Sequence, residues 1–280
     1  MTKRRRPWLA ALLSVLAPAL GHVYAGRPGR GVVVGLAYLA GVLGLMLLAS
    51  RARSALALMA LLAALGVAYV LVARDAFRIA RRAGDAYPLA WFNRWWGYAL
   101  VLVVLLVVQG LYGRFVRREI VQAFRLPSGA MAPTLLIGDH FLVDKRAYRV
   151  GDPQRLDVVV FESPADRTTL FVKRILGLPG DTIEIRDKIV RLNGAPLDEP
   201  YATRSDRTDE KSPASADHGP LTVPAGHYFI LGDNRDASLD SRAVGPIPRE
   251  KIFGRARILY WSWDHAAGAV RWDRIGLPVR

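Results

Sequence analysis

The sequence predicts a membrane-anchored protein in which N-terminal transmembrane helices are followed by a mostly-β domain. Three observations predict this fold class. Long stretches without charge lie within the first 113 residues, short β-favouring runs take over from about residue 120, and the basic excess is confined to the first part. Residues 1–119 hold 16 Lys and Arg against 3 Asp and Glu, whereas residues 120–280 hold 23 against 21. Cations beside long apolar runs are typical of membrane spans.

The uncharged stretches cover residues 31–50, 54–73 and 95–113. Each approaches or reaches the roughly 20 residues that cross a hydrocarbon core. Tryptophans at the entry of the last stretch are typical of an interfacial aromatic belt. We therefore expect a membrane domain over 31–113 with about three transmembrane helices.

The first apolar stretch, "WLAALLSVLAPAL", is shorter and is interrupted by Pro18. It follows four basic residues, so it resembles a cleaved signal peptide, but charge counting favours another interpretation. The segment 74–94 carries five Arg against two acids, which predicts that it is cytoplasmic. The basic N-terminus favours the same side, so we interpret 1–30 as a basic N-terminus plus an interfacial or re-entrant segment. The last span then leads out of the cytoplasm, which puts residues 114–280 on the outer face of a cytoplasmic (inner) membrane.

Residues 114–280 read as one mostly-β domain. Runs rich in Val, Ile, Phe and Tyr, such as "HFLVDK", "LDVVVFES", "HYFILGD" and "RARILYWSW", alternate with turn residues. "RDKIVRLNGAPL" predicts a hairpin strand that ends in an Asn-Gly turn. The polar stretch 201–220 predicts a long exposed loop.

Composition excludes several classes of function. The chain has no cysteine, and its five histidines show no HExxH spacing, which argues against a zinc peptidase. The basic excess lies beside membrane spans and no recognition motif is present, so nucleic acid is not an expected partner. Nothing in the sequence calls for a metal or another cofactor, and the oligomeric state is undetermined.

Lys173 lies inside the apolar run "LFVKRILG", in a chain that has six Lys against thirty-three Arg. If its side chain points inward, burial lowers its pKa from about 10.4 towards neutrality, which makes a usable base. The alternative is a lysine at a sheet edge whose amine reaches solvent. A second polar stretch, "LGDNRDASLDSR", reads either as a calcium loop or as a lattice of Asp–Arg ion pairs. The acid spacing departs from that of calcium loops, which favours the ion pairs.

Four stretches in order, "PSGAMAPTLLIGD", "DVVVF", "FVKRILGLPGD" and "GDNRDASLDSR", lie behind the hydrophobic segments. Together they resemble the type I signal peptidases, membrane-bound serine proteases that remove signal peptides from exported preproteins. The resemblance covers roughly 120–262 and implies a Ser–Lys dyad. It departs from the family at Leu156, where a glycine is usual, and at Ala237, where an asparagine is common.

The resemblance implies a role for each matching residue. Lys173 matches the general base, Ser238 the residue that orients its amine, and Ser128 a side chain that stabilises the oxyanion. Asp240 and Arg242 match a structural ion pair, and Asp233 and Arg235 lie beside them. The residues that match the lining of shallow pockets for small side chains, as at Ala-X-Ala cleavage sites, are Phe124, Leu126, Pro127, Met131, Leu135, Phe171 and Val172.

The nucleophile of the family corresponds to Ala130, which has no hydroxyl. This chain is therefore expected to be inactive or strongly impaired. Three accounts of Ala130 stay open: a substitution engineered into a competent peptidase, a natural inactive homologue that binds signal peptides without cutting them, or replacement of the nucleophile by Ser128. Retention of Lys173 and of "GDNRD" disfavours the second account, because a buried lysine without a role is only a desolvation cost.

In an alternative of another class, the membrane half is the functional part of the protein and the β domain is an adaptor. The stretch "LSVLAPALGHVYAGRPGRG" resembles the start of a small two-helix membrane module. A scaffold of this kind predicts that residues 1–90 bind a partner, or membrane lipid, without the β domain.

Overall fold

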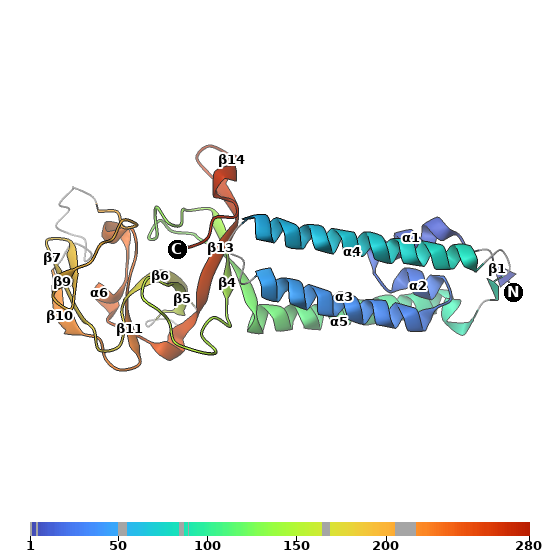
Figure 1. Cartoon of the computed structure of the whole chain (residues 1–280), viewed down its shortest axis with the longest axis horizontal. Coiled ribbons are helices and arrows are strands. Elements are labelled where there is room, and N and C mark those ends of the chain that lie inside the picture. Colours follow the sequence, from blue (N-terminus) through green and yellow to red (C-terminus); the bar gives the residue numbers. More distant parts are fainter. Residues whose placement is uncertain are drawn as a thin grey trace. The chain divides into compact units, whose positions relative to one another are not determined.

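The computed structural model describes residues 2–3, 5–49, 55–83, 87–88, 90–163, 169–204 and 217–280. These residues form two compact units, a helical unit that includes Leu56–Arg118 and a β unit that includes Glu119–Arg280 (Figure 1). Long apolar helices followed by a mostly-β unit confirm the predicted fold class. The domain boundaries inferred from the sequence remain predictions.

The helical unit consists of helices and one short strand pair. Its elements are β1 (Thr2–Lys3), α1 (Pro7–Leu16), α2 (Leu20–Tyr24), α3 (Pro28–Ala49), α4 (Ala55–Arg82), β2 (Tyr87–Pro88), η1 (Trp91–Asn93) and α5 (Trp95–Glu119). Three helices in the described part of the chain are long and apolar enough to cross a membrane. They are Pro28–Leu48, Met59–Arg82 and Trp95–Glu119, with mean hydropathies of 2.3, 1.8 and 2.2.

The predicted cytoplasmic loop 74–94 is wrong at its beginning, because α4 continues to Arg82. Residues 67–82 contain neither Gly nor Pro and are rich in Ala and Arg, which are good helix formers, so nothing ends the helix after the apolar stretch. The N-terminal segment forms two short helices, α1 and α2, that are separated around Pro18. Its interfacial or re-entrant position remains a prediction.

Polar contacts join the helices within this unit. The Tyr69 hydroxyl donates to the Tyr38 hydroxyl at 3.1 Å, which links α4 to α3, and the Tyr112 hydroxyl of α5 donates to Leu39 O of α3 at 3.1 Å. Gly21 lies so close to α1 that a Cβ there would be 2.1 Å from Ala10 O, so only glycine fits.

The β unit is built on an eight-stranded antiparallel sheet with the strand order β12-β11-β6-β5-β13-β4-β3, in which β14 pairs with the end of β13. Its strands are β3 (Val121–Arg125), β4 (Asp139–Asp144), β5 (Val158–Glu162), β6 (Leu170–Gly177), β11 (His227–Leu231), β12 (Ile247–Pro248), β13 (Ile252–Asp264) and β14 (Ala269–Val270). Figure 1 shows β13 as a long strand of this unit, and it pairs with β4, β5 and β14.

A second, four-stranded sheet has the order β10-β7-β8-β9. Its strands are β7 (Thr182–Arg186), β8 (Ile189–Leu192), β9 (Ala195–Pro196) and β10 (His218–Thr222). Short helical turns complete the unit as η2 (Arg235–Ala237), α6 (Ser241–Val244), η3 (Arg249–Lys251) and η4 (Trp272–Arg274).

Two local predictions have different outcomes in the second sheet. The Asn-Gly turn is confirmed, because Leu192 pairs with Ala195 across Asn193 and Gly194, whose φ angles are +53° and +85°. The loop predicted over 201–220 is wrong at its end, because His218–Thr222 forms β10 against β7. A polar strand of this kind does not show the alternation by which strands are recognised. Residues 205–216 of that loop lie outside the described residues.

Candidate active site

Lys173 lies in the interior of the large sheet. Its strand β6 pairs with β5 on one side and with β11 on the other, and Lys173 pairs with Val159 of β5. Only 3% of Lys173 is exposed, so the inward orientation is confirmed and the edge-lysine alternative is wrong. The apolar residues around Lys173 in the sequence indicated this orientation, because β6 is buried on both faces from Lys173 onward.

The loop that contains Ala130 is held against the segment that follows β11. The backbone N–H of Asn234 donates to Ala130 O at 3.1 Å, and its side-chain Nδ2 donates to Gly129 O at 3.2 Å. A Cβ at Gly232 would lie 2.5 Å from Ala130 O, so the close approach of the two segments requires glycine. Ala130 itself is buried, whereas Ser128, two residues earlier on the loop, is exposed.

Ser238 lies at the same place, since the same Cβ would be 2.2 Å from Ser238 Oγ. In the antiparallel ladder Leu231 pairs with Arg174, and continuing this register by one residue puts Gly232 beside Lys173. The structure therefore brings Ala130 and Ser238 together at Gly232, and the register places Lys173 on the neighbouring strand. Their chemical roles remain predictions.

A buried carboxylate supports this group of residues. Asp240 Oδ2 accepts hydrogen bonds from Ser238 Oγ at 2.7 Å and from the Gly232 N–H at 3.0 Å. Arg242 donates to the same carboxylate through Nε and Nη2, both at 2.8 Å, as the predicted ion pair requires. Burial alone raises the pKa of Asp240, but the bonds from Arg242, Gly232 and Ser238 outweigh it and lower that pKa.

Burial is also the main influence on the pKa of the Lys173 amine. It lowers the pKa of Lys173 to about 8, against the opposing attraction of Asp240 and Asp233 and with a contribution from the charge of Arg242. A substantial fraction of Lys173 is then neutral at slightly alkaline pH, and a neutral amine accepts a proton.

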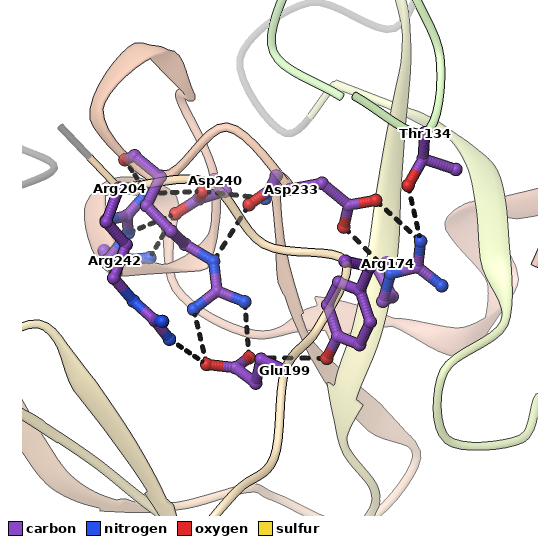
Figure 2. Close-up of polar contacts among 10 residues, drawn as sticks. Thr134, Arg174, Glu199, Arg204, Asp233, Asp240 and Arg242 are labelled. Carbon is purple, nitrogen blue, oxygen red and sulfur yellow. Dashed lines mark hydrogen bonds and ion pairs between the residues drawn. The ribbon is translucent and has the colours of Figure 1, made fainter. Parts of the chain in front are cut away.

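Two further ion pairs lie beside Asp240, and Figure 2 shows them as parts of one polar cluster. Arg174 Nε and Nη2 donate to Asp233 at 2.8 and 2.6 Å, and both side chains are buried. Arg235 pairs in the same bidentate way with Glu199, which also accepts from Arg204 at 2.5 Å. Asp233 and Asp240 of the stretch LGDNRDASLDSR are thus paired with arginines, as the ion-pair interpretation expects, whereas Asp236 pairs with Lys188 at 3.8 Å.

Sequence reasoning missed several residues of this cluster. Glu199 belongs to a stretch with no motif, and nothing in the sequence connects it to Arg235. Arg174 lies within "FVKRILGLPGD" but has no role predicted from the sequence, yet its guanidinium donates to Thr134 Oγ1 at 3.2 Å, on the loop that follows Ala130. Asn234 lies inside the quoted motif, but its contact with the loop depends on the fold.

Leu156 occupies the position where the family has glycine, and its φ is +69°. That left-handed conformation is unfavourable for residues with a Cβ, by about 1 kcal/mol or more. Two hydrogen bonds hold the backbone in this conformation: the Leu156 N–H donates to Ile175 O at 2.8 Å, and the Leu156 carbonyl accepts from Arg174 at 3.1 Å.

The residues predicted to line substrate pockets fall into two groups. Leu126, Met131 and Leu135 are buried in the core of the large sheet. The others are at least partly exposed, namely Phe124, Pro127, Phe171 and Val172. Phe124 and Val172 pack on that same core, so an apolar surface lies beside the Ala130 loop.

One side of the first half of β6 is open in the described structure. Leu170, Phe171 and Val172 pair with β5, whereas the described β11 ladder pairs with β6 only from Arg174 onward and its continuation places Gly232 beside Lys173. Unpaired backbone groups of this kind accept an added strand. Among the described residues, no group of three His, Asp or Glu side chains is arranged to hold a metal ion.

The fold and the site are those of a membrane-anchored protein whose β unit buries a lysine of lowered pKa. Residues 94–261 match the family model described as "Signal peptidase, peptidase S26". The chain is 37% identical over 171 residues to the probable signal peptidase I-2 of Synechocystis, which covers 59% of this chain and 72% of that protein. It is 32% identical over 172 residues to signal peptidase I T of Bacillus subtilis, which covers 60% and 86%.

A crystal structure of a signal peptidase I from Enterococcus faecalis V583 also matches, with 35% identity, 38% of this chain and 97% of that chain covered, and a TM-score of 0.33. On the family model and the relatives, the chain belongs to the signal peptidase family, peptidase S26. By family it is a signal peptidase I, a membrane-associated serine endopeptidase whose substrates are preproteins that carry signal peptides.

Proposed function

We propose that this chain recognises signal peptides at the outer face of the cytoplasmic membrane, and that Ala130 leaves it unable, or almost unable, to cut them. The observation that carries the proposal is Lys173, a buried amine whose pKa is lowered to about 8 next to the Ala130 loop. Burying a lysine costs stability, so its presence is best explained by use as a base.

With a serine at position 130, the site has what acyl transfer needs. The serine Oγ attacks the peptide carbonyl carbon while neutral Lys173 takes the Oγ proton, and the resulting ammonium returns that proton to the leaving amine. The hydroxyl of Ser128 and the backbone N–H of residue 130 stabilise the oxyanion. Ser238 and Asp240 orient the amine of Lys173. Water then attacks the acyl-enzyme, again with Lys173 as the base.

With alanine at position 130, the same site lacks its nucleophile. A methyl group has no lone pair, and loss of the nucleophile in a serine protease costs on the order of 10⁶ in kcat. Substrate binding depends on other groups, which are retained. The chain therefore holds a signal peptide without forming an acyl-enzyme.

The substrate binds as an extended strand along the open side of Leu170–Val172, next to Lys173. Backbone hydrogen bonds to β6 hold it in place, and alternate side chains face the apolar surface beside the loop. Small side chains, as at Ala-X-Ala cleavage sites, pack against the partly exposed Phe124 and Val172. This geometry also presents the carbonyl of the cleaved bond to position 130.

The membrane helices hold the β unit where preproteins emerge. Five arginines in 74–94 favour the cytoplasmic side for the end of α4, and α5 then leads to the outer face. A preprotein held in the same bilayer meets the site at a high effective concentration.

The test compares this chain with its Ala130→Ser variant on a preprotein with an Ala-X-Ala site, in detergent at a pH near 8. We expect cleavage by the serine variant alone, and loss of that cleavage when Lys173→Met is added. Ala132→Ser, a serine on the same loop two residues further on, is the matched control and is expected to be inactive. Binding of an uncut signal peptide to the original chain is measured by fluorescence anisotropy.

Each other outcome contradicts part of the proposal. If neither chain cuts, the catalytic assignment is wrong, and the anisotropy result decides whether binding survives. Cleavage by the original chain identifies Ser128 as the nucleophile. Cleavage by the Ala130→Ser, Lys173→Met double variant removes Lys173 from the role of base.

A further inference from the structure

The helical unit contains a cleft of about 870 Å³ that the peptidase proposal does not use. Its walls come from the turn between α2 and α3, residues 25–30, and from the C-terminal end of α4. Arg27, Arg30 and Arg82 line it. The volume is that of sites for small molecules, which are about 300–1,000 Å³.

The walls of the cleft are held by packing and backbone contacts. Ala10, Ala25, Ala76 and Ala80 form a buried cluster that joins α1, the turn and α4. The Arg27 N–H donates to His22 O at 2.9 Å, which fixes the turn at the end of α2. Small side chains allow these segments to approach closely, so the cleft is a built feature of the fold.

A buried polar contact fixes one of the arginines. Asp75 of α4 accepts from Arg30 Nε at 2.9 Å and from Arg30 Nη2 at 2.8 Å. The fully buried His22 lies with Nε2 3.0 Å from the same carboxylate. The charge of Arg30 is therefore balanced by Asp75, and α2, α3 and α4 are joined at this point.

Arg27 and Arg82 are different. Within the described ranges neither side chain forms an ion pair with an acid, and both are exposed towards the cleft. Counting the described residues alone, these two guanidinium groups give the cleft a net positive charge. Guanidinium groups bind phosphate oxygens in bidentate geometry, and basic pockets at the ends of transmembrane helices accept phospholipid head groups.

The simpler account of these arginines is that they set membrane orientation. That function requires positive charge at the correct end of the spans but does not require a common cleft. It also gives no reason for Asp75 to hold Arg30 and His22 in a fixed arrangement. The defined walls and the shared cleft favour a binding site.

We propose that this cleft binds a phosphate-bearing anion, with the phosphate held between Arg27 and Arg82. The site belongs to the helical unit and is independent of the peptidase site and of Ala130. The anion is either the head group of an anionic phospholipid or a soluble phosphate compound, and the test separates the two sources.

The full chain is reconstituted in nanodiscs of phosphatidylcholine alone or of phosphatidylcholine with phosphatidylglycerol or cardiolipin. Lipid binding is measured by native mass spectrometry and thermal stability by scanning fluorimetry. Inorganic phosphate and pyrophosphate are titrated separately into the phosphatidylcholine sample. The variant is Arg27→Gln with Arg82→Gln, and the charge-matched control is Arg74→Gln with Arg78→Gln, on the exposed surface of α4 and outside the cleft lining.

We expect the original chain and the control to bind the anion equally, and the cleft variant to bind at least about tenfold more weakly, since each lost charged hydrogen bond is worth roughly a factor of ten or more. A response to anionic lipid alone identifies a head group, whereas a response to phosphate or pyrophosphate identifies a soluble ligand. Equal losses in variant and control mean general surface attraction and overturn the proposal. The absence of any response also overturns it. Equal melting temperatures of all chains in phosphatidylcholine show that the variants fold.

Discussion

On the proposed mechanism, a single oxygen atom at position 130 separates this chain from a complete Ser–Lys dyad. The surroundings of position 130 are ordered, since Asn234 holds the loop and Ser238, which is hydrogen-bonded to Asp240, approaches Ala130 O at Gly232. What the loss of the nucleophile leaves behind is a buried amine. Its energetic cost is therefore not offset by catalysis in this chain, and it is measurable.

Lys173→Met is expected to stabilise the chain near neutral pH by up to about 3 kcal/mol, at roughly 1.4 kcal/mol for each unit of pKa. The folded pKa, about 8, lies below the ordinary value of 10.5, so folding has to bury a charge at pH values below 8. Between 8 and 10.5 the unfolded chain holds the proton and the folded chain does not, so the stability of the original chain rises with pH. The advantage of methionine shrinks over that range and disappears above it.

Urea unfolding of both chains in detergent across this pH range measures the difference. Lys251→Met, at a half-buried lysine outside the site, is the control and is expected to change the free energy of unfolding by less than about 0.5 kcal/mol. A Lys173→Met variant that is less stable than the original at neutral pH contradicts the cost assigned to burial.

At the scale of elements, two segments far apart in sequence form the site by close backbone approach. The loop after β3 and the segment after β11 meet at Gly232, where the space for a Cβ is already occupied by Ala130 O and Ser238. Gly194, in the hairpin between β8 and β9, is different, because a Cβ there has no atom within 4 Å although its φ is +85°. The two glycines are required for different reasons.

In the Ala130→Ser background, Gly232→Ala is expected to reduce kcat by about a hundredfold or more, because the added methyl separates the loop from Ser238 by a fraction of an ångström or more. It also costs about 1–3 kcal/mol of stability through overpacking. Gly194→Ala is the matched control, and is expected to cost about 1 kcal/mol through its backbone conformation without changing kcat. Cleavage kinetics and urea unfolding separate the two effects. Equal kcat values for the two variants contradict the assignment of Gly232 to the site.

At the scale of the whole molecule, function depends on the side of the membrane on which each unit lies. The proposal puts the β unit outside and the end of α4 in the cytoplasm. Since the chain has no cysteine, a single introduced thiol reports its own location. Val150 of the β unit is 94% exposed, and Arg81 near the end of α4 is also exposed.

Val150→Cys is expected to react with a membrane-impermeant maleimide in intact spheroplasts, whereas Arg81→Cys is expected to react only after permeabilisation. The physical reason is the bias of arginine-rich segments towards the cytoplasm, which orients α4 and therefore α5. Labelling of both variants in permeabilised spheroplasts is the control for thiol accessibility. The reverse pattern contradicts the proposed topology and with it the access of exported preproteins to the site.

The sequence by itself determined the fold class, the three apolar helices, the Asn-Gly hairpin and the order of the boxes that carry the family resemblance. These features depend on local composition, on the periodicity of apolar residues and on motif spacing, all of which can be read from neighbouring residues. It also indicated Lys173, because an apolar strand around a lysine is a local signal. It placed the end of α4 and the start of β10 wrongly, because polar helix turns and polar strands have weak local patterns.

Only the tertiary structure decided which residues meet. Three contacts join segments that are tens of residues apart: Glu199 pairs with Arg235, Arg174 pairs with Asp233, and Ala130 approaches Ser238 at Gly232. The same is true of the cleft, where a turn near the N-terminus meets the end of α4. Contacts of this kind follow from sheet register and helix packing, which depend on the whole chain, so no local pattern encodes them.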